Sequence, residues 1–330
     1  MTQRVKPGMT AGMTRQEALA RLDPELATSL VGPDVDLATV DLPSYRAQAR
    51  VFQAQLYPPP DQPVDCVTCP GLDGEPATQV RLVRPRDGRA PRGAVLFVHG
   101  GGLVVGDAAT LDGRNQQLAD HTGWLVAAAS YRLAPEHRWP GALMDVAAAW
   151  QWLAGQREAL GLSGLPLVVY GMSAGAGLAA ALCLWLRREG LGQPDGQLLV
   201  YPMLDHLTGR GVPPDRDGWI GWTCASNQFG WSSYAGPAGP PADLSDGTFA
   251  PAHAADLAGL APAWIGVGTL DLFLDECLAY AGRLAAAGVD TTLQTYPGAA
   301  HGFVRVTEAA CSRRFQADTL AWLDRLHIGR

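Results

Sequence analysis

The chain has 330 residues, of which 47% are hydrophobic and 17% are charged. This composition provides enough apolar material for a large core and excludes wholesale disorder. The formal net charge is −7, with Lys6 as the single lysine among 25 basic residues. No basic run stands out, so a nucleic-acid partner is not expected. The longest nearly unbroken apolar stretch, 177–186, is about half the ~20 residues that a membrane span requires.

The amino-terminal residues and the cysteines indicate neither secretion nor a metal site. The first residues contain no apolar segment of the kind found in signal peptides, so a cytoplasmic location is expected. Six cysteines are too sparse for a disulfide framework. The Cys66-x-x-Cys69 pair lacks the second pair of ligands that a zinc site needs, and its segment is typical of a short strand that enters a turn. No cofactor or metal is predicted.

In chain order, helical spacing comes first and alternation with strands follows. Apolar residues at helical spacing predict helices within 14–30 and 42–56, and the prolines at 58–60 end this region. Two alternating segments then predict a hairpin, and apolar runs that alternate with helical stretches predict a mostly parallel, doubly wound α/β sheet of eight strands. The predicted strands are 64–69, 79–85, 93–99, 124–130, 165–171, 196–202, 261–268 and 291–297. The predicted later helices are 111–121, 142–156, 174–188, 274–287 and 307–326.

One insertion, 205–250, interrupts the alternation and carries no strand signal. Within it, the segment 219–234 contains the aromatic residues Trp219, Trp222, Phe229, Trp231 and Tyr234. At the 8% aromatic content of the whole chain, a segment of this length would hold about one aromatic residue. The excess indicates either a substrate pocket or a small core of the insertion that contacts no ligand.

The motif Gly171-Met172-Ser173-Ala174-Gly175 lies between a predicted strand and a predicted helix. This is the context of a nucleophile elbow, in which small flanking residues allow a sharp turn that exposes the serine hydroxyl. The helix amino terminus behind such a serine also favours negative charge. Ser173 is therefore the candidate nucleophile.

A second motif, His99-Gly100-Gly101-Gly102, directly follows the strand predicted at 93–99. A run of glycines lets neighbouring backbone N–H groups point toward one spot, as an oxyanion hole requires. A phosphate loop is the competing interpretation, but the sequence has no G-x-x-x-x-G-K-[ST] motif and no lysine beyond Lys6. His99 is expected to anchor this loop through a side-chain hydrogen bond and to take no proton.

A serine nucleophile needs a base, and the base needs an orienting acid. Among seven histidines, His301 stands in a loop after the last predicted strand, and Asp271 follows the strand predicted at 261–268. Both positions are at strand ends, where an α/β sheet presents its catalytic groups. Asp275 and Glu276 are expected to open the next helix. The order Ser173, Asp271, His301 is that of α/β-hydrolases.

Taken together, these motifs resemble the bacterial hormone-sensitive-lipase family of esterases. The resemblance rests on HGGG, the segment 131–145, GMSAG, the box 271–276 and YPGAAHGF, and runs from about Val64 to the carboxyl terminus. It implies an α/β-hydrolase core, 61–204 and 251–330, with a helical cap made of 1–60 and the insertion 205–250. It implies that the oxyanion donors are the N–H groups of Gly101, Gly102 and Ala174. It also implies structural roles for Tyr131, Arg132, Glu136 and Asp145.

The predicted function is a serine carboxylesterase that hydrolyses short- to medium-chain acyl esters through an acyl-enzyme. Met172 departs from the Asp or Thr that is common before the nucleophile in this family. The alternatives are amide, lactone or carbamate hydrolysis or acyl transfer by the same triad, and a non-catalytic receptor on the same scaffold. The expected partner is a small-molecule ester, and a homodimer is left open. The residues predicted to line the substrate pocket are Leu103, Val104, Trp219, Trp222, Phe229 and Phe303.

Overall fold

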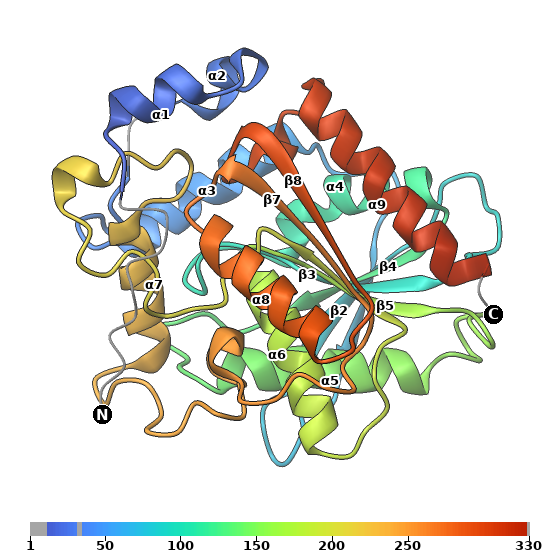
Figure 1. The fold of residues 1–330 in the computed structure, drawn as a ribbon. Coiled ribbons are helices and arrows are strands. Elements are labelled where there is room, and N and C mark those ends of the chain that lie inside the picture. The colour runs from blue at the N-terminus through green and yellow to red at the C-terminus, as the bar shows by residue number, and fades with distance from the viewer. Residues whose placement is uncertain (1–11, 32–34, 329–330) are drawn as a thin grey trace.

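The computed structural model describes residues 12–31 and 35–328, and these form an α/β fold around one sheet (Figure 1). The sheet has eight strands in the order β1-β2-β4-β3-β5-β6-β7-β8. The strands are β1 (Asp65–Cys69), β2 (Thr78–Val83), β3 (Ala94–Val98), β4 (Leu125–Ser130), β5 (Leu167–Met172), β6 (Gly196–Val200), β7 (Ala263–Leu270) and β8 (Thr291–Ala300). The predicted fold class and all eight predicted strands are confirmed.

The sheet is antiparallel at one edge and parallel elsewhere. β1 pairs with β2, and β2 with β4, in antiparallel register, whereas every pair from β4 to β8 is parallel. The central strands β3 and β6 are buried along their whole length. Such continuous apolar runs suit parallel strands that are covered by helices on both faces. Parallel strands end at one edge of the sheet, and the candidate catalytic residues lie along it.

Helices cover both faces of the sheet, with α5, α6 and α8 on one face and α4 and α9 on the other (Figure 1). The helices are α1 (Arg15–Arg21), α2 (Pro24–Leu30), α3 (Leu42–Leu56), α4 (Asp112–Thr122), α5 (Gly141–Gly155), α6 (Ala174–Arg188), α7 (Cys224–Ala235), α8 (Leu274–Ala286) and α9 (Ala310–Ile328). The helical stretch predicted at 14–30 is two helices. Asp23 caps α2 through the Glu25 N–H at 2.9 Å, and Pro24 opens it, because proline suits a first helical turn and not a helix interior.

The insertion contains no strand among its described residues and one α-helix, α7. It lies beside the amino-terminal segments, near α1, α2 and α3 in Figure 1. The Gly218 N–H donates to the Met13 carbonyl at 2.8 Å, and the Ser226 hydroxyl donates to the Val35 carbonyl at 2.8 Å. Two segments that are about two hundred residues apart in sequence thus pack together next to the sheet.

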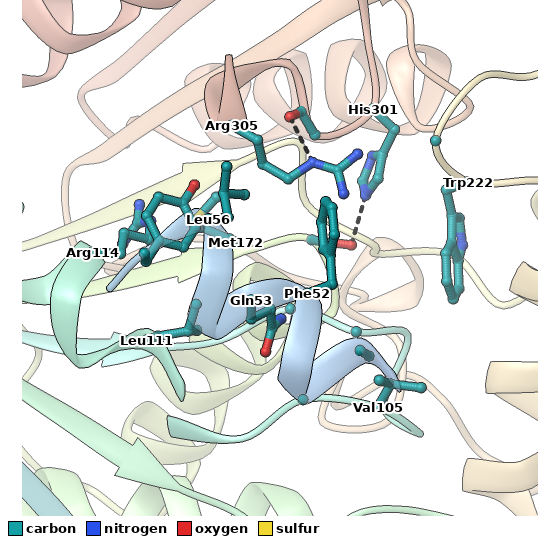
Figure 2. Close-up of a pocket in the computed structure, with 18 of the residues that line it drawn as sticks. Phe52, Gln53, Leu56, Val105, Leu111, Arg114, Met172, Trp222, His301 and Arg305 are labelled. Atoms are coloured by element: carbon teal, nitrogen blue, oxygen red, sulfur yellow. Dashed lines mark hydrogen bonds between the residues drawn. The ribbon is translucent and has the colours of Figure 1, made fainter. Parts of the chain in front are cut away.

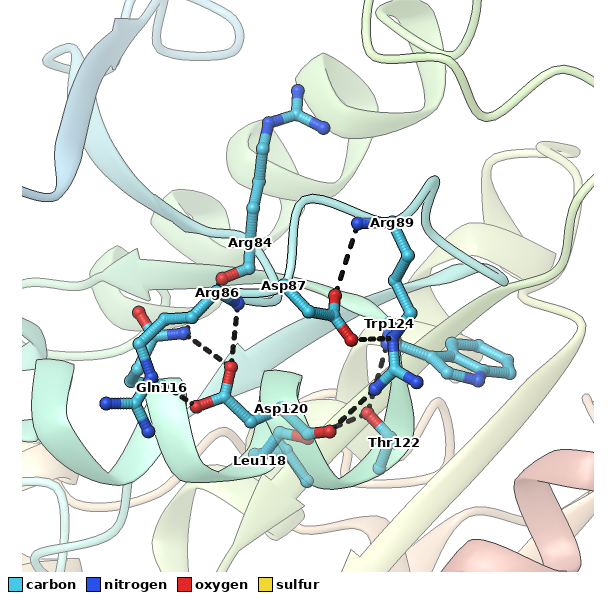
Figure 3. A network of polar contacts seen from close by, with 9 residues as sticks. All are labelled: Arg84, Arg86, Asp87, Arg89, Gln116, Leu118, Asp120, Thr122 and Trp124. Atoms are coloured by element: carbon cyan, nitrogen blue, oxygen red, sulfur yellow. Dashed lines mark hydrogen bonds and ion pairs between the residues drawn. The ribbon is translucent and has the colours of Figure 1, made fainter.

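The loop between β2 and β3 is held to α4 by a polar network (Figure 3). The Asp120 carboxylate accepts hydrogen bonds from the Arg86 backbone N–H and Nε at 2.8 and 2.7 Å. The Asp120 carbonyl accepts from Arg89 Nη2 at 2.7 Å. Gln116 Nε2 donates to the Arg84 carbonyl at 2.8 Å. This network leads into the amino end of β3, away from the edge that carries the candidate site, so its role is structural.

Candidate active site

Ser173 occupies the sharp turn between β5 and α6, with φ 55° and ψ −122°. A positive φ is rare for a residue with a side chain and marks stored strain, which a nucleophile elbow uses to lift the hydroxyl off the strand end. The flanking glycines are required by space. A Cβ added at Gly171 would lie 2.3 Å from the Gly175 carbonyl oxygen, and one added at Gly175 would lie 2.2 Å from that of Val98. The local sequence therefore permits this turn where larger residues would not.

The structure brings the three candidate triad residues together. His301 Nε2 lies 2.9 Å from Ser173 Oγ, and His301 Nδ1 lies 2.8 Å from Asp271 Oδ2. Asp271 is fully buried, and its other carboxylate oxygen accepts the Phe273 N–H at 2.9 Å. Figure 2 shows the hydrogen bond between His301 and the serine hydroxyl. This chain of hydrogen bonds is what a serine needs to lose its proton to an oriented imidazole.

Aromatic rings fix the position of the His301 imidazole. The Tyr201 ring centroid lies 4.6 Å from it, and the Phe273 ring meets it edge-on at 5.2 Å. The Trp222 ring lies farther away, at 6.4 Å. Rings on several sides limit rotation of the imidazole, so the geometry does not depend on two hydrogen bonds alone.

The predicted glycine loop lies beside Ser173. Gly101 and Gly102 have φ values of 121° and 58°, which favour glycine. The Gly101 carbonyl accepts hydrogen bonds from Val104 and Val105 at 3.1 and 2.9 Å, so a tight turn holds the loop. Among the described residues, no group accepts a hydrogen bond from the N–H of Gly101, Gly102 or Ala174. These three donors are therefore free to receive an oxygen atom.

His99 supports this loop from below, as predicted. Its Nδ1 lies 2.8 Å from the Gly100 carbonyl oxygen, and its ring stacks on that of Tyr131 with centroids 4.2 Å apart. The Tyr131 hydroxyl donates to the His99 carbonyl at 2.8 Å. Burial lowers the pKa of His99 and so favours the neutral imidazole.

The segment 131–145 is held by ion pairs. Arg132 Nε lies 2.8 Å from Asp145 Oδ2, and Arg132 Nη2 lies 2.7 Å from Glu75 Oε2. Glu136 pairs with Arg46 of α3 at 2.7 Å, and the Arg46 hydrogen bond lowers the pKa of Glu136 to about 2. These contacts fit the structural roles that the resemblance implied for this segment.

Sequence reasoning missed Arg46 as a residue that positions the site. Besides Glu136, it donates through Nε to the Val104 carbonyl at 2.7 Å and through Nη2 to the Ala134 carbonyl at 2.8 Å. One side chain thus ties α3 to the turn of the glycine loop and to the segment 131–145. Its contacts are 58 to 90 residues away in sequence, and no local motif signals them.

Glu276 lies in the first turn of α8, as predicted, and its side chain is buried. It accepts the Leu204 N–H at 2.6 Å and a short hydrogen bond from the Thr208 hydroxyl. Burial raises the pKa of Glu276 well above its ordinary value. This carboxyl group therefore joins α8 to the start of the insertion.

A cavity of about 400 Å³ opens above Ser173 and His301 (Figure 2). Helix α3 forms one wall and contributes Tyr45, Ala49, Phe52, Gln53 and Leu56. Other lining residues include Met172 and Tyr201 at strand ends, Trp222 of the insertion, Arg114 of α4 and Arg305 of a short 3-10 helix. The α3 residues at 45, 49, 52 and 56 follow helical spacing, a signal that the sequence contained.

Of the six residues predicted to line the substrate pocket, only Trp222 is among the described residues that do so. Leu103, Val104, Trp219 and Phe303 are at most 3% exposed and belong to the core, and Phe229 is partly buried against it. Phe303 packs on Tyr296 and Phe315 with ring centroids 5.0 and 5.8 Å away. The prediction for these five residues is corrected, because nearness to the site in sequence does not decide which side of a loop faces the cavity.

Outside this cavity, Asp205, His206 and His253 form a cluster whose candidate ligand atoms lie within 4.8 Å of one another. His253 Nε2 lies 2.8 Å from Asp205 Oδ1, and so these two residues already satisfy each other. None of the three lines the cavity above Ser173.

The Cys66–Cys69 pair lies on β1 with one side chain exposed and the other buried, and both thiols are free. Burial raises the pKa of Cys69 to about 11.

The fold and this geometry define a serine hydrolase built on an α/β sheet, and comparisons with known proteins agree. A family model described as alpha/beta hydrolase fold matches residues 95–305. Ethyl acetate hydrolase from Pseudomonas putida is 35% identical over 300 residues, which cover 86% of this chain and 92% of that protein. Carboxylesterase NlhH of Mycobacterium tuberculosis H37Rv is 32% identical over 249 residues, or 71% of this chain and 73% of that protein. The solved structure of a bacterial heroin esterase has a TM-score of 0.83 at 36% identity, with 93% of this chain and 98% of that chain covered.

The chain therefore belongs to the α/β-hydrolase family of hormone-sensitive-lipase type, and it is a carboxylic-ester hydrolase. The family resemblance and the enzyme class predicted from the sequence are confirmed. In the described part of the chain, no helix is both long and apolar enough to cross a membrane.

Proposed function

We propose that the enzyme hydrolyses short- to medium-chain acyl esters with Ser173 as nucleophile, His301 as general base and Asp271 as the acid that orients His301. The observation that supports these roles is the continuous hydrogen-bond chain from Asp271 through His301 to the Ser173 hydroxyl at the floor of the cavity. Relatives that are named esterases support the reaction class.

In the first half of the reaction, Ser173 Oγ attacks the ester carbonyl carbon while His301 Nε2 takes the hydroxyl proton. The negative charge that develops on the carbonyl oxygen is stabilised by the free N–H groups of Gly101, Gly102 and Ala174. The carbon–oxygen bond to the alcohol then breaks, and His301 gives its proton to the leaving alkoxide. The acyl group remains on Ser173.

In the second half, water replaces the alcohol. His301 takes a proton from this water, the hydroxide attacks the acyl carbon, and the bond to Ser173 Oγ breaks with return of the proton to the serine. Each oxyanion donor is worth about 3–4 kcal/mol at the transition state by analogy with other hydrolases. Asp271 stabilises the imidazolium that exists in both halves.

The cavity supports the proposed substrate size. A volume of about 400 Å³ is near the lower end of the range for small-molecule sites. The name of the relative ethyl acetate hydrolase points in the same direction, toward a small ester. The α3 wall, with Phe52 and Leu56, offers apolar surface to an acyl or alkyl chain.

We propose the domain division that the sequence predicted, with 1–60 and 205–250 as a cap and 61–204 and 251–330 as the core. It is supported by the hydrogen bonds that the insertion donates to the Met13 and Val35 carbonyls and by the presence of α3 in the cavity wall. Residues 1–11 lie outside the described part of the chain. A homodimer and a cytoplasmic location remain predictions, and light scattering of the purified protein tests the first.

The function is tested with Ser173→Ala on p-nitrophenyl acetate and on longer p-nitrophenyl esters. We expect wild-type turnover to be highest for short and medium acyl groups and the variant to lose at least about three orders of magnitude in kcat. Ser226→Ala is a matched control, since this hydroxyl is buried within the insertion, on α7, and lies outside the cavity lining. Equal turnover by Ser173→Ala and wild type would overturn the proposal.

A further inference from the structure

Two arginines line the cavity above Ser173, Arg114 from α4 and Arg305 from the short 3-10 helix that follows His301. Figure 2 shows Arg114 at one end of the cavity and Arg305 beside His301. No aspartate or glutamate is among the described residues that line this cavity, and Met172, next to the nucleophile, is uncharged. The lining therefore holds two positive charges and no negative one.

Arg114 is held by aromatic rings rather than by an acid. Its guanidinium carbon lies 4.6 Å from the Phe97 ring centroid and 5.5 Å from that of Tyr170. Nη2 donates to the Tyr170 hydroxyl at 3.1 Å, whereas Nη1 is buried with no hydrogen-bond partner among the described residues. A guanidinium has five N–H donors, and a buried donor without an acceptor is costly. This side chain is therefore ready to bind an acceptor that enters the cavity.

Arg305 is also without an acid. Its Nε donates to the Gly302 carbonyl at 3.2 Å, and no carboxylate of the described residues lies within ion-pair distance of it. Two other partly buried arginines of the described chain have an acidic partner. Arg81 lies 2.8 Å from Asp112, and Arg132 lies 2.8 Å from Asp145. Arg283, also partly buried, lacks an acid among the described residues as well, but it lies outside the cavity and donates to the Ala252 and Ala254 carbonyls. The two arginines of the cavity therefore combine the missing acid with a place in the cavity that holds Ser173.

Tyr57 and Tyr201 complete this group, since both line the same cavity. Burial raises the pKa of each hydroxyl, and Arg114 and Arg305 both oppose that effect. Both guanidinium groups therefore lie close enough to the two tyrosines to influence them electrostatically, and all four side chains line the one cavity. Neither hydroxyl has a hydrogen-bond partner within the described part of the chain, so both are free to donate as well.

We infer that the cavity selects esters that carry a carboxylate at some distance from the ester bond, held by Arg305 and Arg114. Guanidinium groups bind carboxylates through paired hydrogen bonds, and a site closed off from water strengthens them. The inference rests on the proposed function and leaves its chemistry unchanged: water cleaves the ester bond, and the products are an acid and an alcohol. The carboxylate can belong to the acyl side or to the alcohol side.

The test compares kcat/KM for charged and uncharged esters of equal shape, measured by titration of the released acid. On the acyl side, the pair is monoethyl adipate and its methyl-ketone isostere. On the alcohol side, it is acetylated γ-hydroxybutyrate and its methyl-ketone isostere. We expect wild type to favour the charged member of one pair by at least about tenfold, and this preference to fall as salt is added.

Arginine variants show whether these two residues are responsible. We expect Arg305→Gln and Arg114→Gln each to lower the charged-to-neutral ratio by at least about tenfold, and Arg305→Lys to keep most of it. Arg50→Gln is the matched control, because Arg50 is an exposed arginine of α3 that pairs with Asp107. Its ratio should equal that of wild type. If Arg114→Gln does not fold, Arg305→Gln alone tests the inference. A general loss of activity lowers kcat/KM for the charged and the neutral ester equally and so leaves their ratio unchanged.

A wild-type ratio at or below one for both pairs, or a ratio that is the same in Arg305→Gln as in wild type, would overturn the inference. Failure of the proposed function has a different signature. If wild type and Ser173→Ala turn over the charged and the neutral esters at equal rates, the proposed function is wrong. Turnover of the neutral esters that depends on Ser173 but shows no preference for charge would defeat only the selection of a carboxylate.

Discussion

Replacement of Asp271 by asparagine exchanges one carboxylate oxygen of the proposed triad for an NH2 group and keeps the shape of the side chain. In wild type, Asp271 Oδ2 lies 2.8 Å from His301 Nδ1, which places the proton on Nδ1 and leaves Nε2 free to accept from Ser173. An asparagine amide that donates to Nδ1 would favour the opposite tautomer, with the proton on Nε2. The imidazole would then be unable to take the Ser173 proton.

The expected loss follows from charge as well as from the tautomer. Two unit charges about 4 Å apart at an effective dielectric constant near 20 interact by about 4 kcal/mol, which corresponds to roughly a thousandfold in rate. The wrong tautomer adds to this, so we expect Asp271→Asn to lower kcat by about 10³–10⁴. The Phe273 N–H, which donates to Asp271 Oδ1 at 2.9 Å, can still donate to the asparagine carbonyl oxygen.

The assay is kcat for p-nitrophenyl acetate, with circular dichroism to show that the variant is folded. Asp275→Asn is the matched control, four residues further along in the first turn of α8, and we expect it to stay within about threefold of wild type. A loss below about tenfold for Asp271→Asn, or a larger loss for Asp275→Asn, would refute the assignment of Asp271.

Three further predictions concern stability. Gly171→Ala places a Cβ 2.3 Å from the Gly175 carbonyl oxygen, so urea unfolding should show that the free energy of unfolding falls by about 1–3 kcal/mol. Gly192→Ala is the control, because its Cβ meets nothing within 4 Å, and its stability should be close to that of wild type. Equal losses in the two variants would contradict the steric argument. Arg46→Ala removes its bonds to the Val104 and Ala134 carbonyls and to Glu136 and should lower stability by about 1–3 kcal/mol together with kcat/KM, and a change in neither would show that α3 is held without it. Burial raises the pKa of Glu276 above the ordinary value of 4.5, so the folded state binds this proton more tightly, and the free energy of unfolding falls as pH rises from about 4.5 through the raised value. The stability of Glu276→Gln relative to wild type should therefore increase between about pH 5 and 8. A constant difference across that range would contradict the raised pKa.

The strands, and the three candidate triad residues that the structure brings together, could be predicted because their signals are local. The GMSAG turn, the glycine run after His99 and the positions of Asp271 and His301 after strands each depend on a few neighbouring residues. Parallel α/β topology then places strand ends at one edge. Pro24 is also a local signal, because proline suits the first turn of a helix and not its interior, and it marks the boundary between α1 and α2 within 14–30.

The lining of the cavity could not be predicted in the same way. Whether Phe303 enters the cavity or the core depends on its packing with Tyr296 and Phe315, which no single segment encodes. The α3 residues at 45, 49, 52 and 56 were a usable signal, because apolar residues at helical spacing need a surface to face. Tyr45, Ala49 and Leu56 are only partly buried against the core, and all four residues line the cavity. Arg114 and Arg305 are distinguished by their place in the cavity lining and by the lack of an acidic partner in the described part of the chain. Both features depend on the folded structure, and the sequence alone does not show them.

The central claim, that Ser173 carries the acyl group during turnover, is tested most directly by mass spectrometry. The protein is treated with a fluorophosphonate ester, digested, and the modified peptide is sequenced. The account predicts one adduct, on Ser173, with loss of esterase activity in proportion to labelling and no adduct in Ser173→Ala. An adduct on another residue, or full labelling of wild type without loss of activity, would contradict it.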